Sequence, residues 1–137
     1  VTAIPAYMAK YCQGLKRVSA PSAKDVGANA FEQCIALTEV SFPAVTNVVM
    51  NAFMSCSSLA RIALPSVKTI QSGAFSSCSN CLEYDFSECT SIPSLQNKSA
   101  FSGINANAKI IVPAALYDKW IAATNWTNYA SYIVAAV

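Results

Sequence analysis

Four cysteines recur at a single interval, and this interval constrains the fold more than any other feature of the chain. Cys12, Cys34, Cys56 and Cys78 follow one another at a step of 22 residues. A period of this length is typical of a solenoid, in which each repeat is one supersecondary unit that stacks on its neighbours. The sequence therefore predicts a stack of similar rungs.

Other residue types keep the same step, so the period does not depend on cysteine alone. The apolar columns are Ile4, Val26, Val48, Ile70 and Ile92; Leu15, Leu37 and Leu59; Val18, Val40, Ile62 and Tyr84; and Ala20, Phe42, Leu64 and Phe86. An Ala-Phe pair recurs at residues 30–31, 52–53 and 74–75, and a proline at 21, 43 and 65. The next pair, Ala100-Phe101, comes 26 residues later, which indicates four residues inserted near Ser94 to Ser99.

Each repeat reads A-F-x-x-C-x-x-L-x-x-V/I-x-Φ-P-x-V-x-x-V/I, where Φ is apolar, and residues 30–43 and 52–65 are its clearest copies. This pattern resembles the BspA-type leucine-rich repeat of bacterial cell-surface proteins over roughly residues 4 to 112. The resemblance implies an α/β leucine-rich repeat solenoid. It would be right-handed and mostly β, with a ladder of parallel strands, short turns or helices, and a C-terminal capping helix.

The spacing within one repeat predicts its local structure. The alternation from Leu37 to Phe42 indicates a short strand, which Pro43 ends because proline cannot donate to a ladder. The following V-x-x-V/I segment is expected to return along the opposite face, and A-F-x-x-C to form a tight turn or a single helical turn. We expect about four to five rungs, with the strands after Leu15, Leu37 and Leu59 in one sheet.

The end of the chain departs from the repeat. Lys109 to Val112 reads as the last strand, and Pro113 suits the first turn of a helix over residues 114–124. Trp120, Trp126 and Tyr129 provide the bulk that covers a last rung. We therefore expect one domain over residues 1–137, with a solenoid over 1–112 and a cap over 113–137. A membrane-surface helix is the alternative for this amphipathic stretch, although it carries few basic residues.

Composition and charge narrow the partner classes. The chain is 54% hydrophobic and 12% charged, with a net charge of +2 and its Lys and Arg scattered singly. We therefore expect no nucleic-acid partner. No apolar run approaches the roughly 18 to 20 residues of a membrane span, so no direct insertion is expected. Because the chain opens in mid-repeat at Ile4, we expect a C-terminal piece of a longer or processed protein; a short protein with an improvised cap is the alternative.

The six cysteines allow three functional readings, and the first is a disulfide framework, which their even number would permit. Equivalent positions on successive rungs have parallel bonding vectors, so Cys12, Cys34, Cys56 and Cys78 are expected to be reduced and buried, as small hydrophobes. The alternatives are redox chemistry at Cys78-Ser79-Asn80-Cys81 and zinc held by Cys78, Cys81 and Cys89. Cys89 is the expected exception to burial, and a disulfide between Cys81 and Cys89 stays open.

Catalytic machinery is sparse. The chain has no histidine, which excludes Ser-His and Cys-His arrangements. Glu83, Asp85 and Glu88 are the only close carboxylates, and they are expected on solvated faces. We predict that the protein is not an enzyme, with no catalytic residues, no cofactor and no metal.

One polar column crosses the strand face. Arg17, Glu39, Arg61 and Glu83 share a column, so their side chains are expected to point outward with alternating sign. They either compensate one another, since like charges stacked directly would repel, or form a partner-binding face. The resemblance implies a cell-surface or secreted module for adhesion-type binding of a host or bacterial surface protein or glycan. The alternative is a spacer or stalk that carries another domain, and the oligomeric state stays open.

Overall fold

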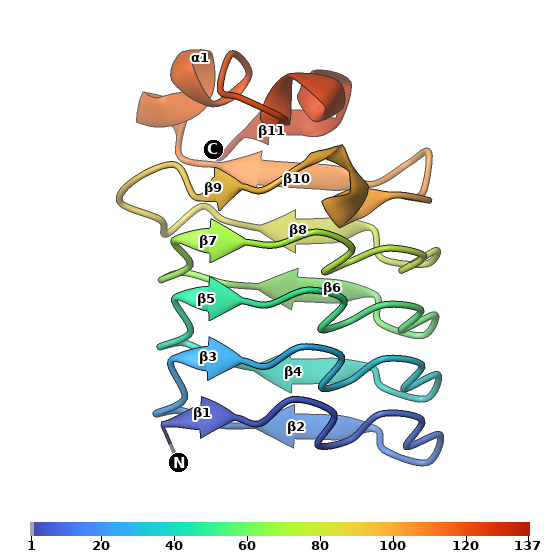
Figure 1. Ribbon diagram of the computed structural model, residues 1–137. Coiled ribbons are helices and arrows are strands. Elements are labelled where there is room, and N and C mark those ends of the chain that lie inside the picture. Colours follow the sequence, from blue (N-terminus) through green and yellow to red (C-terminus); the bar gives the residue numbers. More distant parts are fainter. Residues whose placement is uncertain (1) are drawn as a thin grey trace.

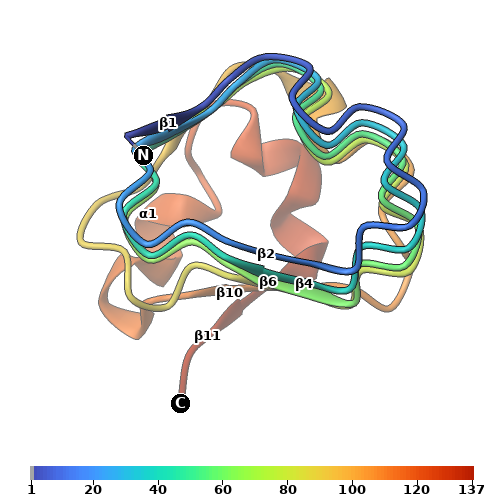
Figure 2. The same ribbon diagram turned by 90° about the horizontal axis from the view of Figure 1, so that it is seen from below.

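The computed structural model describes residues 2–137, and the chain in it climbs as a right-handed coil (Figure 1). Each rung contributes one strand to each of two faces (Figure 2). The front face carries β1 (Ala3–Ile4), β3 (Asp25–Val26), β5 (Asn47–Val48), β7 (Thr69–Ile70) and β9 (Ser94–Leu95). The rear face carries β2 (Arg17–Ser19), β4 (Glu39–Ser41), β6 (Arg61–Ala63), β8 (Glu83–Asp85), β10 (Lys109–Val112) and β11 (Ile133–Ala135). The predicted solenoid of parallel strands is confirmed, and the V-x-x-V/I segments form the front sheet.

The rear ladder is interrupted between its second and third rungs. β2 pairs with β4, whereas β6 pairs with β8, β8 with β10 and β10 with β11, all in parallel. The expectation of one sheet for the strands after Leu15, Leu37 and Leu59 is therefore wrong in this detail. β4 and β6 still lie side by side. Side chains join the two rungs at this step, since the Phe42 and Phe53 ring centroids lie 6.1 Å apart.

A second hydrogen-bond ladder runs through the A-F-x-x-C turns. The amide of Phe31 donates to the Ala52 carbonyl at 2.8 Å, and the amide of Phe53 donates to the Ala74 carbonyl at 2.8 Å. Each of the first four turns places two residues in the left-handed region, and the fifth turn places one there. The first column is Tyr7, Asn29, Asn51 and Gly73, and the second is Tyr11, Gln33, Ser55, Ser77 and Gly103. The predicted tight turn is confirmed.

A ladder of aromatic rings fills the core. Phe31, Phe53, Phe75 and Phe101 are fully buried, and their ring centroids follow one another at 5.5, 5.5 and 5.4 Å with interplanar angles of 15°, 2° and 12°. At its C-terminal end the ladder meets Trp126, 5.7 Å from the Phe101 ring. The repeat thus places one phenyl ring per rung at the same depth, and the rings hold successive rungs together.

The inserted residues lie mostly earlier than predicted. Ile70 pairs with Leu95, which is a step of 25 residues rather than 22. Three of the four extra residues therefore lie between Cys89 and Ser94, in a loop that bulges beside β9 (Figure 1). Leu95, and not Ile92, continues the apolar column. The reason is that Cys89 still occupies the buried column of the preceding rungs, so the extra length is accommodated only after it.

The cap is built from short helical pieces. They are η2 (Ala114–Leu116), α1 (Tyr117–Trp120) and η3 (Trp126–Tyr132), with η1 (Lys98–Phe101) lying earlier in the fifth rung. A helix reaching Thr124 was expected, but the α-helix ends at Trp120. Asn125 has a φ of 66°, and its side-chain amide donates to the carbonyls of Leu95 and Gln96, which turns the chain back over the last rung.

The capping role of the tryptophans is visible in their burial. Trp120 is fully buried and Trp126 is 1% exposed, so neither ring is free to lie on a membrane surface. The indole of Trp126 also donates to the Pro93 carbonyl at 2.8 Å. No helix within residues 2–137 combines the length and apolar character that crossing a membrane requires.

Candidate functional site

The predicted polar column lies on the rear strands, and the structure joins its members in two pairs. Arg17 Nε lies 3.4 Å from Glu39 Oε2, and Arg61 Nε lies 3.0 Å from Glu83 Oε2. The break in the ladder between β4 and β6 separates the two pairs. We refer to Arg17, Glu39, Arg61 and Glu83 as the charged strip.

Neighbouring side chains also pair with the charges of the charged strip. Arg61 Nη2 lies 2.7 Å from Asp85 Oδ2, and the other carboxylate oxygen of Asp85 accepts from the amide and hydroxyl of Ser87. Exposed ion pairs of this kind each contribute only about 0.2 to 1 kcal/mol. A partner on this face would have to compete with contacts that the charges already make.

The cysteine column is buried except at its first member. The thiols of Cys34, Cys56 and Cys78 each donate to a backbone carbonyl 3.1 Å away, those of Ala9, Phe31 and Phe53 respectively. Burial raises the pKa of all three thiols, that of Cys56 to about 12. Cys12 was expected to be buried, but it is exposed, because no rung covers it on its N-terminal side among the described residues.

The remaining cysteines behave as core residues. Cys81 and Cys89 are buried free thiols that donate to different carbonyls, those of Glu83 and Leu64. The expectation that Cys89 escapes burial is wrong, because it occupies the column of Val45 and Val67. Burial raises the pKa of Cys81 and of Cys89 to about 11, which disfavours the thiolate that redox and zinc chemistry need. Residues 2–137 hold no group of three His, Cys, Asp or Glu side chains placed to bind a metal ion.

A pair of exposed tyrosines on the first turn is the feature that the sequence interpretation missed. The Tyr7 and Tyr11 side chains flank Lys10, whose Nζ lies 5.3 and 4.9 Å from the two ring centroids. Lys10 Nζ also lies 3.0 Å from Glu32 Oε2, and this contact raises the pKa of Lys10. Asn29 donates to the same carboxylate at 3.2 Å. We call Tyr7, Lys10 and Tyr11 the tyrosine edge.

The backbone of the tyrosine edge is strained. Tyr7 and Tyr11 have φ values of 61° and 63°, a region that bulky residues rarely adopt. A left-handed conformation costs a residue with a side chain roughly 1 to 2 kcal/mol. The repeat imposes this conformation on later rungs too: the column of Tyr7 continues with Asn29, Asn51 and Gly73, which tolerate it, and the column of Tyr11 with Gln33, Ser55 and Ser77. The signal in the sequence was therefore a tyrosine in a column of turn residues.

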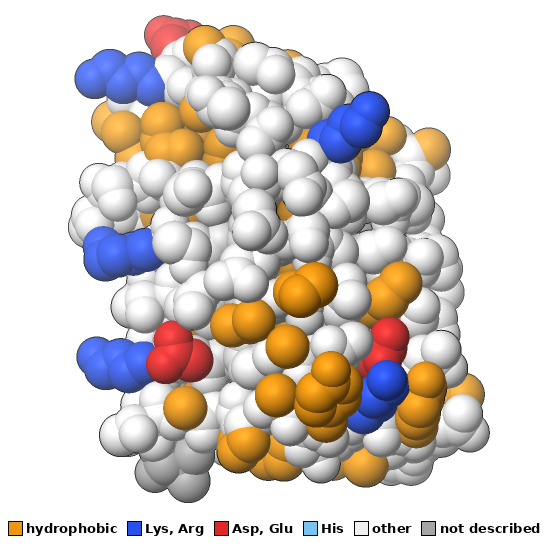
Figure 3. All heavy atoms as spheres, in the orientation of Figure 1, with side chains coloured by type: hydrophobic (Ala, Val, Ile, Leu, Met, Phe, Trp, Pro, Cys, Tyr) orange, Lys and Arg blue, Asp and Glu red, His pale blue; other side chains and the backbone are white. Residues whose placement is uncertain are grey.

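The tyrosine edge is exposed and largely apolar. Tyr7, Met8 and Tyr11 are 58%, 51% and 54% exposed. Figure 3 shows hydrophobic atoms gathered on the lower part of the molecule, where the first rungs lie. Exposed large apolar groups that cluster are typical of protein interaction surfaces.

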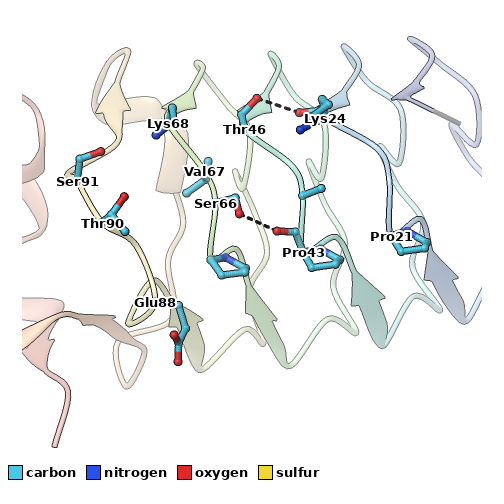
Figure 4. A pocket seen from close by; sticks show the side chains of 12 residues that line it. Pro21, Lys24, Pro43, Thr46, Ser66, Val67, Lys68, Glu88, Thr90 and Ser91 are labelled. Carbon is cyan, nitrogen blue, oxygen red and sulfur yellow. Dashed lines mark hydrogen bonds between the residues drawn. The ribbon is translucent and has the colours of Figure 1, made fainter.

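A groove follows the corner between the rear and the front strands. It has a volume of about 600 Å³. Its lining comes from equivalent positions of successive rungs and from the inserted loop: Pro21, Lys24, Pro43, Ala44, Thr46, Pro65, Ser66, Val67, Lys68, Glu88, Thr90 and Ser91. Figure 4 shows the prolines in one row and Lys24, Thr46 and Lys68 in a second row. We call this feature the proline–lysine groove.

Comparison with known proteins agrees with the repeat architecture. No curated protein matches the chain. The family model for the BspA type leucine rich repeat region matches in six copies over residues 2–118. Repeats of this kind are generally protein-interaction modules and typically non-catalytic. The matched span includes all five rungs and the start of the cap. Because the match covers most of the sequence, the chain belongs to the BspA-type leucine-rich repeat family.

Proposed function

We propose that this chain is a non-enzymatic module of a cell-surface or secreted protein, and that it binds a protein partner through the tyrosine edge in adhesion-type contacts. The observation that carries the proposal is the grouping of two tyrosine rings, those of Tyr7 and Tyr11, around the Lys10 ammonium on a single turn.

The tyrosine edge has the properties of a binding hot spot. Tyrosine is enriched among the residues that dominate interface energies, because its ring buries a large area at a small cost in side-chain entropy. Lys10 holds both rings from between them and is itself held by Glu32. The rings are therefore ordered before a partner arrives, which lowers the entropic cost of binding.

The charged strip is the weaker candidate for a partner-binding face. Arg17, Glu39, Arg61 and Glu83 already pair within the chain, so binding there would exchange one set of ion pairs for another. This internal pairing favours the second candidate function, a spacer or stalk that carries another domain and binds nothing itself.

Binding measurements on a matched pair of variants separate these functions. The purified chain is applied to arrays of immobilised extracellular proteins and of glycans. The test variant is Tyr7→Asn with Tyr11→Gln, which installs the residues of the next rung, Asn29 and Gln33. The control variant is Arg17→Ala with Glu39→Ala, which removes one pair of the charged strip.

The proposal expects protein ligands whose affinity falls at least about tenfold in the tyrosine variant and less than about twofold in the strip variant. Loss in the strip variant alone would move the site to the strand face. Binding to glycans only, or to nothing on either array, would contradict the proposal, and the second result would favour the spacer.

Release of the chain from intact cells by added protease tests the surface location.

A further inference from the structure

We propose that the proline–lysine groove binds a linear acidic glycan, with carboxylate or sulfate groups of the glycan held by Lys24 and Lys68. This site is distinct from the tyrosine edge, and the inference does not depend on the proposed function. Three properties of the groove support it, namely its unpaired cations, its repeat distance and the chemistry of its walls.

The two lysines of the groove lack anionic partners. Within residues 2–137, neither Lys24 nor Lys68 forms an ion pair, whereas Lys10, Arg17 and Arg61 all do. Both lysine side chains are exposed in the row shown in Figure 4. The only carboxylate in the lining is Glu88, which lies at the far end beside the proline row and points away from Lys68 (Figure 4). The lysine side of the groove is therefore positively charged.

The repeat fixes the spacing of these cations. Lys24, Thr46 and Lys68 occupy one column in three successive rungs. Since neighbouring strands lie about 4.8 Å apart, the backbone positions of the two lysines are roughly 10 Å apart. In an extended, β-linked glycan, the length of one sugar ring is close to the distance between two rungs of the protein. Acidic groups on every second sugar ring would therefore meet both lysines. Side chains on one face of an extended peptide recur at about 7 Å, which does not match.

The walls provide the contacts that sugar rings require. Pro21, Pro43 and Pro65 form an aliphatic row in register with the rungs. The hydroxyls of Thr46 and Ser66 donate to the carbonyls of Lys24 and Pro43, which leaves their oxygen lone pairs to accept from sugar hydroxyls. The inserted loop contributes Thr90 and Ser91 at one end of the groove.

Calorimetry with a defined oligosaccharide tests the site. The probe is a hyaluronan octasaccharide, which carries a carboxylate on every second ring, and its carboxyl-reduced form is the neutral control. The test variant is Lys24→Thr with Lys68→Thr, which repeats Thr46 and so preserves the fold. The matched control is Lys16→Thr with Lys109→Thr, which removes the same charge outside the groove. A poly-glutamate peptide of similar length tests the competing class.

We expect the acidic octasaccharide to bind the unmodified chain. Its affinity should fall about tenfold or more in the groove variant and about twofold or less in the control variant. Added salt should also weaken the binding, because it screens the charges. The tyrosine variant should bind as tightly as the unmodified chain, which separates this site from the tyrosine edge. Equal binding of the neutral octasaccharide, equal losses in both lysine variants, tighter binding of poly-glutamate, or no binding at low salt would each overturn the proposal.

Discussion

Truncation of one ring in the aromatic ladder tests how the rungs are held together. Phe53 is fully buried, and its ring stacks on those of Phe31 and Phe75 with centroids 5.5 Å away on either side. Truncating a buried phenylalanine costs about 3 to 5 kcal/mol, and each aromatic pair adds about 0.5 to 1.5 kcal/mol beyond its buried area. Because Phe53→Ala breaks two stacked pairs, we expect a loss near the upper end, about 4 to 5 kcal/mol.

Two further variants calibrate this loss. Phe53→Leu keeps most of the apolar volume and removes only the stacking, so we expect a loss of about 1 to 3 kcal/mol. Arg61→Ala removes two ion pairs from a side chain that is 53% exposed, for about 1 kcal/mol or less. Urea unfolding followed by circular dichroism measures all three. With a slope of about 2 kcal/mol/M, the midpoint falls by about 2 M for Phe53→Ala and by at most about 0.5 M for Arg61→Ala.

Two outcomes of these unfolding measurements would contradict the prediction. Equal midpoints for Phe53→Ala and Arg61→Ala would mean that the inward and outward columns are assigned wrongly. An unchanged midpoint for Phe53→Leu would show that burial alone, and not ring stacking, joins the rungs.

Three other predictions concern the thiols and the cap. Under native conditions one thiol, Cys12, should react rapidly with a disulfide reagent and all six after denaturation; several fast native thiols would contradict the buried column. Since burial raises the pKa of Cys56 from 9.0 to about 12, the folded state retains a proton there that the unfolded chain releases, so stability should stay level below about pH 8 and fall between pH 9 and 12 by about 1.4 kcal/mol per pH unit for this thiol. Alkaline titration of the unmodified chain against Cys56→Ala checks this, and equal slopes would refute it. Finally, removal of residues 113–137 should give an aggregating protein, because Phe86 and Phe101 lose the cover of Trp120 and Trp126 and β10 loses β11; a soluble truncation that unfolds cooperatively would show that the tail is not a cap.

The sequence was sufficient to predict features that repeat in every rung. The columns led to the parallel strands, the buried Phe ladder and the strand at Lys109 to Val112, since equivalent residues in a stack share one environment. It was less informative where that equivalence fails. Cys12 shares a column with three buried cysteines, yet it lies in the first of the described rungs and is exposed there.

The other differences between the sequence-based expectations and the structure arise from contacts between residues far apart in the sequence. Ile92 matches its column by residue type, but strand pairing places Leu95 there. The cap turns at Asn125 because its amide reaches carbonyls in the fifth rung, a contact that no local pattern predicts. The tyrosine edge lies on a turn with two left-handed residues, Tyr7 and Tyr11, and the spacing of apolar residues does not specify such backbone angles.

The most direct test of the proposed function is the location of a bound protein partner. Hydrogen exchange is measured on the free chain and on its complex with the tightest protein ligand from the array. We predict slower exchange confined to residues 6–12 and the neighbouring turn at residues 28–33, with no change at residues 17–19 and 39–41. Protection of the rear strands with an unchanged first turn would contradict it, because the partner would then lie on the charged strip rather than on the tyrosine edge.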